Sequence, residues 1–238
     1  GRFQHLGFSF HDNLDAFKEI VDAYDNWTLA QIQYNIMDVN LQAGTAGLHY
    51  AADRGLAVVV MEPLRGGLLA NKPPEPVQAL WDTAGTDRTP ADWALQWVWN
   101  QPEVSLLLSG MSTFQQVAEN LASADRSGPG TMTPEELALV DRVRDQYDAL
   151  AAIPCTNCKY CQPCPNDVAI PRIFELYNQA VMFNARDPMR AAYTHWVREE
   201  ERADNCIECG ECETKCPQEI DIIDWLKQVH TYFTAQQA

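Results

Sequence analysis

The distribution of cysteine constrains this chain more than any other feature of its sequence. The 238 residues contain eight cysteines, and residues 1–154 contain none of them. Because one part is free of cysteine and the other is rich in it, we expect two domains, residues 1–152 and residues 153–238. The cysteines form two runs, Cys155-x2-Cys158-x2-Cys161-x2-Cys164-Pro165 and Cys206-x2-Cys209-x2-Cys212-x3-Cys216-Pro217.

The spacing within these runs favours metal clusters over disulfides. Two-residue gaps let three consecutive cysteines surround one face of a cubane cluster, and a distant fourth cysteine completes the set of thiolates. A secreted disulfide scaffold would be small and would not follow a long cysteine-free domain. Zinc is the alternative, although its usual four-cysteine sites separate two Cys-x2-Cys pairs by a longer loop. We therefore expect iron–sulfur clusters in a reducing, cytoplasmic compartment.

The second run has the spacing of two-cluster bacterial ferredoxins, and the first run is one residue shorter before its last cysteine. Helix patterns run from Pro171 to about Asn184, from Pro188 to about Arg202, and onward from Asp221. This arrangement resembles the all-α dicluster ferredoxin domains that are attached to larger oxidoreductases. The resemblance implies two 4Fe-4S clusters in which the runs exchange their fourth cysteines: Cys155, Cys158, Cys161 and Cys216 hold one, and Cys206, Cys209, Cys212 and Cys164 hold the other.

Residues 1–152 alternate between strand and helix patterns. Thr89, Thr113 and Thr133 are each followed by residues typical of a helix start, and we expect them to be N-caps. Alternating strands and helices predict a parallel sheet covered by helices. Four such units make either a small open α/β sheet or half of a (β/α)8 barrel. The strands are expected at residues 5–10, 29–35, 56–61 and 104–109, and residues 62–76 are expected to form a loop rich in Gly and Pro.

Four segments of this half resemble the aldo-keto reductases. They are Leu6-Gly7-Phe8-Ser9-Phe10-His11, Gln31-Ile-Gln-Tyr-Asn35, residues 59–67 and residues 110–120. They are similar to the fifth to eighth barrel strands with their loops, in the branch of the family that is fused to a dicluster domain. The resemblance implies an α/β fold: a partial (β/α)8 (TIM-type) barrel of strands 5–8 only, followed by an all-α dicluster ferredoxin domain.

The same resemblance implies a nicotinamide-binding site at the carboxyl ends of the strands. Ser9 and Gln31 would hold the carboxamide, because an amide needs both a donor and an acceptor. A phosphate contact at Ser112 would favour NADP(H) over NAD. The remaining implied residues are Leu64, Arg65 and Gly66 at the pyrophosphate and Gln116, Glu119 and Asn120 at the adenosine end. The Asp/Tyr/Lys/His tetrad of the family is absent, so no catalytic residue is assigned.

Two functions remain open. In the first, the full-length protein is an NADP-dependent oxidoreductase of the aldo-keto reductase type that transfers electrons through two 4Fe-4S clusters to a redox partner protein. In the second, the chain is a non-enzymatic electron-carrier or assembly subunit that uses the half-barrel as a docking scaffold. A half-barrel has two open sheet edges. We therefore expect a homodimer, or pairing with the missing N-terminal half-barrel.

Charge and hydropathy exclude other classes. The formal net charge is −16, which argues against nucleic-acid binding and favours a basic redox partner. No segment approaches the roughly 20 apolar residues of a membrane span. We expect Trp93 and Trp97 to be core residues and Tyr34 to be hydrogen-bonded scaffold, and we expect the gene to begin upstream of Gly1.

Overall fold

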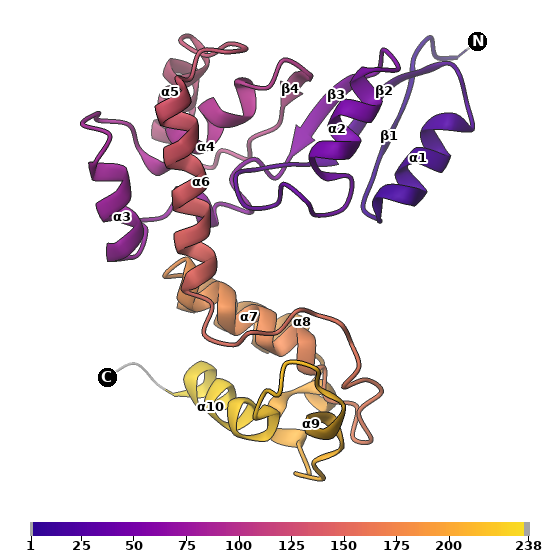
Figure 1. Ribbon diagram of the computed structural model, residues 1–238, viewed down its shortest axis with the longest axis vertical. Coiled ribbons are helices and arrows are strands. Elements are labelled where there is room, and N and C mark those ends of the chain that lie inside the picture. The colour runs from indigo at the N-terminus through magenta and orange to yellow at the C-terminus, as the bar shows by residue number, and fades with distance from the viewer. Residues whose placement is uncertain (1, 236–238) are drawn as a thin grey trace. The chain divides into compact units, whose positions relative to one another are not determined.

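The computed structural model describes residues 2–235 of the chain (Figure 1). These residues form two compact units that divide between Asp145 and Gln146. The long helix α6 (Pro134–Ala149) runs across this division. Each unit is described here by itself.

The first unit is built on a four-stranded parallel sheet. Its strands are β1 (Leu6–Ser9), β2 (Trp27–Gln33), β3 (Ala57–Met61) and β4 (Val104–Leu107), and they lie in that order. Every neighbouring pair is parallel. Helices α1 (Leu14–Asp22) and α2 (Gly44–Ala52) make the first two crossovers between strands (Figure 1). The prediction of an α/β fold with four parallel strands is confirmed.

Side-chain caps begin the later helices of this unit. The Thr89 hydroxyl accepts a hydrogen bond from the Asp92 N–H at 3.1 Å and caps α4 (Pro90–Trp99). Thr113 forms a capping box with Gln116 at the start of α5 (Phe114–Ala124). Thr133 and Glu136 exchange the same pair of bonds before α6. The three predicted caps are confirmed, and they fix where the helices start.

The predicted loop at residues 62–76 was wrong in part. It contains the 3-10 turn η1 (Leu68–Ala70) and the start of helix α3 (Glu75–Asp82). Pro76 lies in the first turn of α3, where no intrahelical N–H is needed. Helical spacing then buries Val77 and Trp81, and the Trp81 ring stacks on Trp93 at 5.0 Å. A proline at this position therefore does not prevent the helix.

Aromatic side chains fill the core of the first unit. Trp93 and Trp97 are buried, as predicted. Tyr34 is 1% exposed, and its hydroxyl lies 3.0 Å from the Thr45 hydroxyl. Burial raises the pKa of Tyr34. Tyr34 is thus a buried core residue with a hydrogen-bonded hydroxyl, as predicted.

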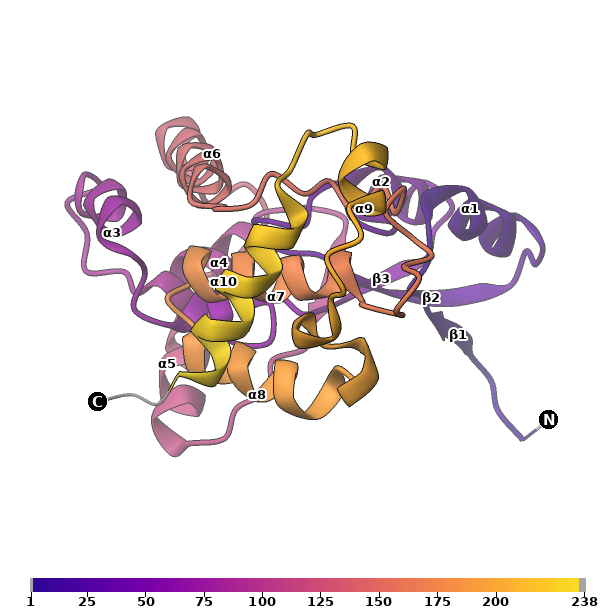
Figure 2. The same ribbon diagram turned by 90° about the horizontal axis from the view of Figure 1, so that it is seen from below.

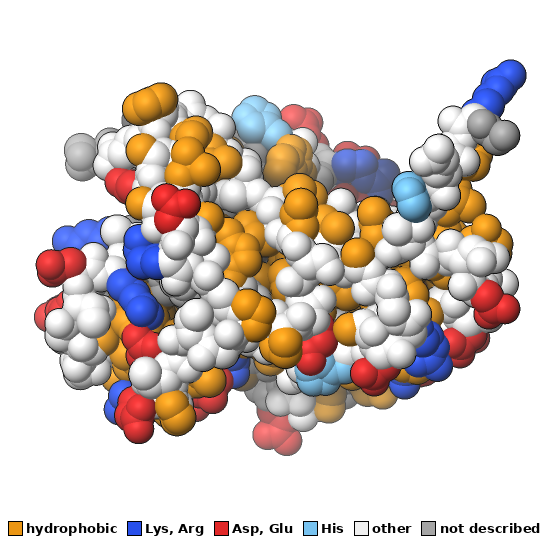
Figure 3. Space-filling model, turned by 90° about the horizontal axis from the view of Figure 1, so that it is seen from above, with side chains coloured by type: hydrophobic (Ala, Val, Ile, Leu, Met, Phe, Trp, Pro, Cys, Tyr) orange, Lys and Arg blue, Asp and Glu red, His pale blue; other side chains and the backbone are white. Residues whose placement is uncertain are grey.

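Both edge strands of the sheet expose apolar side chains. β1 and β4 each have one neighbouring strand within the sheet. Leu6 on β1 is 38% exposed, and Leu106 on β4 is 49% exposed. Leu108 and Phe114, which follow β4, are also exposed. Hydrophobic side chains are visible on the surface of the molecule in Figure 3.

Within the second unit, the described residues form helices and turns without a strand. Its helices are α7 (Ile170–Met182), α8 (Arg186–Trp196), α9 (Glu211–Lys215) and α10 (Ile222–Thr234), with 3-10 turns η2 (Glu199–Glu201) and η3 (Ala203–Asn205). α7 packs against α8 and α10 (Figure 2). Their buried faces form one apolar core that includes Ile173, Phe174, Leu226, Val229 and Phe233.

Two predictions for the second unit were wrong. The helix expected to reach Arg202 ends at Trp196, because Val197 is extended and buried. The three glutamates that follow form η2 instead of the exposed face of a longer helix. Helix α9 was not predicted, and it contains Cys212 of the second run. Across residues 2–235, no helix has both the length and the apolar character of a membrane span.

Candidate functional site

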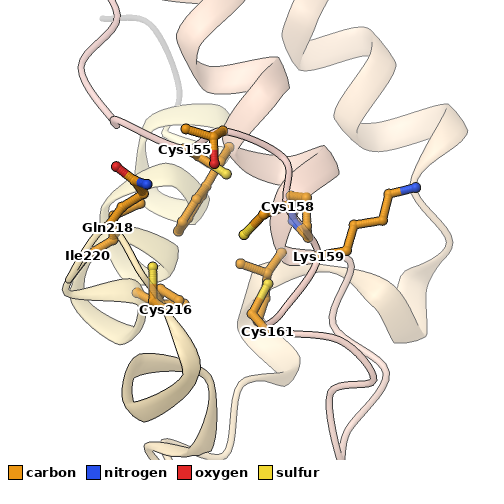
Figure 4. Close-up of a pocket in the computed structure, with 12 residues that line it drawn as sticks. Cys155, Cys158, Lys159, Cys161, Cys216, Gln218 and Ile220 are labelled. Carbon is orange, nitrogen blue, oxygen red and sulfur yellow. The ribbon is translucent and has the colours of Figure 1, made fainter. Parts of the chain in front are cut away.

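Four cysteines from both runs surround a hollow in the second unit. Cys155, Cys158 and Cys161 of the first run and Cys216 of the second line a space of about 340 Å³. Figure 4 shows their sulfur atoms directed toward a common centre. The first three come from one irregular segment before α7, and the fourth comes from the segment that joins α9 to α10.

The remaining four cysteines surround a second hollow of similar size. Cys206, Cys209 and Cys212 of the second run and Cys164 of the first line a space of about 320 Å³. Each run therefore contributes three cysteines to one hollow and one to the other. This is the grouping that the ferredoxin resemblance implies.

The core of the second unit supplies the other walls of both hollows. Ile170 at the start of α7 lines both of them. Phe174 and Ile220 complete the first hollow, and Val168 and Leu226 complete the second. All five side chains are buried or nearly so. The thiols thus face an apolar, water-poor space.

The two runs share one backbone conformation around their second cysteine. The residue before it and the residue after it are left-handed in both runs. These are Asn157 (φ 56°) and Lys159 (φ 64°) in the first run, and Glu208 (φ 56°) and Gly210 (φ 77°) in the second. The repeated turn directs three successive cysteines to one side of the chain. Cys158 and Cys209, at the centre of the turns, are exposed, and the other six cysteines are partly buried.

Burial and mutual repulsion disfavour free thiolates here. Burial raises the pKa of Cys155 and Cys161, and the neighbouring cysteines, including Cys216, raise it further. Burial also raises the pKa of Cys212 to about 11, with a contribution from the Glu213 carboxylate. A thiolate is the form that binds metal. A cationic centre that binds all four sulfurs would therefore release protons on binding.

The hollows are wider than the site of a single ion. Among residues 2–235, no three His, Cys, Asp or Glu side chains are grouped as ligands of one metal ion. The four sulfurs of the first hollow surround a volume instead of a point (Figure 4). This donor set, four sulfurs around an apolar space, is the one that iron–sulfur clusters use.

Predicted nicotinamide contacts meet at the carboxyl ends of β1 and β2. Ser9 and Gln31 are register partners across the two strands. The Gln31 amide donates to the Ser9 hydroxyl at 3.3 Å and lies 3.5 Å from the sulfur of Met61, the last residue of β3. Ser9 is exposed and Gln31 is partly buried. The pair offers a hydroxyl and an amide side by side at the strand ends.

The loop after β3 contains the three predicted pyrophosphate residues. Leu64 and Arg65 are partly buried, and Gly66 is exposed. Arg65 and Gly66 are both left-handed, with φ of 49° and 62°. The Arg65 guanidinium lies 3.5 Å from a carboxylate oxygen of Asp38. The loop therefore has a defined, partly strained shape with a cation at a fixed place.

Sequence reasoning missed the residues that hold this loop, Asn35 and Asp38. The Asn35 amide is fully buried and donates to the Glu62 carbonyl at 3.0 Å and to Asp38 at 2.9 Å. Its oxygen accepts from the backbone of Met37 and Asp38. All four of its hydrogen-bonding positions are thus used. Asn35 lies two residues after the end of β2 and is followed by an Asp three residues later, and this pair was the available signal.

The predicted adenosine residues lie around the start of α5. The Gln116 side-chain oxygen accepts from the Ser112 N–H at 2.8 Å and from the Thr113 N–H. Ser112 and Gln116 are therefore adjacent and exposed. The other two residues bond elsewhere: Glu119 accepts from Gln115, and Asn120 donates to Ser109. The nine residues predicted to bind the nicotinamide cofactor thus lie in several small groups.

Comparison with known families assigns both parts of the chain. Residues 1–144 match the aldo/keto reductase family, and residues 154–220 match a 4Fe-4S dicluster domain. The first match covers more than half of the chain. The protein belongs to the aldo/keto reductase family, and it carries a 4Fe-4S dicluster domain.

Solved structures of aldo-keto reductases resemble the chain in part. The apo and holo forms of AKR11C1 from Bacillus halodurans are 23% identical, with TM-scores of 0.47 and 0.48. They are matched over 58% of this chain and over 50% and 49% of theirs. The thermostable reductase Tm1743, in complex with the inhibitor epalrestat, is 21% identical over 58% of this chain and 48% of its own, with a TM-score of 0.45. The chain thus spans about half the length of these structures. No curated protein sequence matches it.

Proposed function

We propose that the chain is part of an iron–sulfur aldo-keto reductase that couples NADP(H) to one-electron transfer. In this proposal residues 1–152 supply strands 5–8 of a (β/α)8 barrel, and residues 153–238 form an all-α ferredoxin domain with two 4Fe-4S clusters. The open parallel sheet and its two edge strands support the partial barrel. The membership in the aldo/keto reductase family supports the redox activity.

The observation that carries the proposal is the exchange of cysteines between the two runs. Three thiols of one run and one of the other line each hollow. A ligand set that links the runs in this way needs a multi-atom centre in each hollow, because the sulfurs surround a volume. We assign Cys155, Cys158, Cys161 and Cys216 to the first cluster and Cys164, Cys206, Cys209 and Cys212 to the second.

The residues of the two hollows would bind and shield the clusters. A 4Fe-4S cluster, when bound, supplies one-electron redox chemistry. Ile170, Phe174 and Leu226 exclude water from the sulfurs, and this lowers the local dielectric constant. The exposed Cys158 and Cys209 leave one side of each hollow near the surface. These are the sides at which a redox partner protein could approach.

The nicotinamide cofactor would bind at the carboxyl ends of the strands. Ser9 and Gln31 offer the hydroxyl and amide that a carboxamide requires. Arg65, positioned by Asp38, offers a cation to the pyrophosphate. The exposed Ser112, at the start of α5, offers a hydroxyl to a 2′-phosphate, and this favours NADP(H). The proton donor would come from a part of the barrel outside these four strands.

Metal analysis and paired cysteine variants test the cluster proposal. The purified protein should contain about eight iron and eight sulfide per chain and should give an electron paramagnetic resonance signal after reduction. Cys216→Ser should lose the first cluster and keep the second, and Cys164→Ser should do the reverse. Each variant should therefore retain about half of the iron. Zinc at about two per chain without sulfide would contradict the proposal.

Fluorescence titration with NADPH and NADH tests the cofactor proposal. We expect tighter binding of NADPH, and Ser112→Ala should weaken NADPH binding several-fold while leaving NADH binding unchanged. Equal effects on both cofactors would remove Ser112 from the phosphate site.

A further inference from the structure

A third hollow in the second unit contains no cysteine. It has a volume of about 410 Å³ and is lined mainly by polar side chains. Its walls come from the first cysteine run, the start of α7 and residues 198–201, and its cations are Lys159, Arg172 and Arg198. Small-molecule sites commonly have volumes in this range. Lys159 and Pro171 also line the first cysteine hollow, so the test below measures iron and sulfide together with ligand binding.

Lys159 occupies a backbone position that disfavours it. The equivalent position of the second run, directly after the second cysteine, is Gly210, and both residues are left-handed. Glycine adopts this conformation without steric cost, whereas a lysine pays for it. A Cβ at Gly210 would meet no atom within 4 Å, so space alone does not decide which residue is present. Lys159 therefore occupies a strained backbone position, as Asn157 and Glu208 do in the same two turns, and such strain is concentrated at functional sites.

The Lys159 side chain faces the polar hollow. Figure 4 shows it extending away from the four sulfur atoms of the first cysteine hollow. Its side chain is one of those that line the polar hollow. Among residues 2–235, no ion pair to its ammonium group is present.

The two arginines of the hollow are held in place by carboxylates. Arg172 pairs with Glu175 at 2.8 Å, and Arg198 pairs with Glu201 and with Glu200. These pairs fix the guanidinium groups and partly neutralise them. The lining contains three cations and three carboxylates, Asp167, Glu175 and Glu201. Lys159 is the cation of this set that has no ion pair among residues 2–235.

We propose that this hollow binds a small molecule through a carboxylate or phosphate group, with Lys159 as the principal contact. The two arginines, with their spare N–H groups, would orient the anionic oxygens. The exposed Asn157 amide, which also lines the hollow, would add a neutral donor. The ligand would lie beside the exposed Cys158, one residue from Lys159.

Calorimetric titration of the purified full chain with inorganic phosphate and with succinate tests this site. The two probes separate the two sources of an anionic oxygen, and binding of either supports the proposal. Lys159→Gly should weaken binding of the probe at least tenfold. It should not lower the melting temperature, because it relieves the left-handed strain. Lys159→Arg should restore most of the affinity.

Gly210→Lys is the matched control. It adds a lysine at the equivalent position of the second run, so it should lower the melting temperature without adding a binding site. Failure of the wild-type chain to bind either probe would overturn the proposal. Unchanged affinity in Lys159→Gly would also overturn it. Iron and sulfide analysis of the same samples reports on the clusters separately.

Discussion

Ser123 joins helices α4 and α5 through a buried polar contact. Its hydroxyl donates to Asp92 and accepts from the Gln96 amide at 3.1 Å, and all three side chains are buried. Asp92 also pairs with Arg126 at 2.7 Å. We expect Ser123→Ala to lower the free energy of unfolding by about 1–3 kcal/mol, because buried polar groups lose a partner. Chemical denaturation followed by tryptophan fluorescence measures this change.

Ser105 on β4 provides the control for Ser123. It is exposed, so Ser105→Ala should change stability by less than about 0.5 kcal/mol. Equal effects of the two substitutions would show that the Asp92 contact contributes nothing specific.

For single residues, the sequence predicted the chemical role of a side chain better than its contacts and backbone conformation. The eight cysteines could be singled out because their spacing is tied to a ligand set. Tyr34 could be assigned to the scaffold from its place near a strand end. Asn35 could not be identified as the residue that holds the loop after β3, because its partner Glu62 is 27 residues away. Nor could Lys159 be separated from ordinary surface lysines, because its left-handed backbone is visible only in the structure.

Helix α5 depends on its capping box. Thr113 and Gln116 satisfy N–H groups of the first turn that have no partner within the helix. Thr113→Ala should therefore destabilise the first unit by about 1 kcal/mol, and Thr113→Ser should recover most of this loss. Thermal unfolding of the wild type and the two variants measures the order of their stabilities. A cap that contributes only through burial would instead leave Thr113→Ser as unstable as Thr113→Ala.

Helices were predicted best where local signals agreed. Thr89, Thr113 and Thr133 combine a capping residue with an amphipathic pattern, and each begins a helix. At α3, the abundance of glycine and proline led to the prediction of a loop, but Pro76 lies in the first turn of the helix and does not prevent it. The short α9, five residues that include Cys212, lacks the length for a periodic pattern. Where local sequence signals were ambiguous, tertiary packing thus determined whether a helix formed.

The sheet of the first unit is open along both outer strands. A closed (β/α)8 barrel has no edge strand, because the first and last strands pair. Here β1 and β4 have one neighbour each. Unpaired edges with exposed leucines promote association between chains.

We expect the 238-residue chain to self-associate through the β4 edge. Leu106 lies on β4 and Leu108 directly follows it, two residues apart on one face, and both are exposed. Replacing both with lysine should weaken association by about tenfold or more, equivalent to about 1.4 kcal/mol, because charges at an edge oppose strand pairing. Sedimentation velocity at several protein concentrations measures this. Trp196→Lys in α8 removes an even more exposed apolar side chain far from β4 in sequence and should leave association unchanged. A wild-type chain that stays monomeric at all concentrations would contradict the expectation.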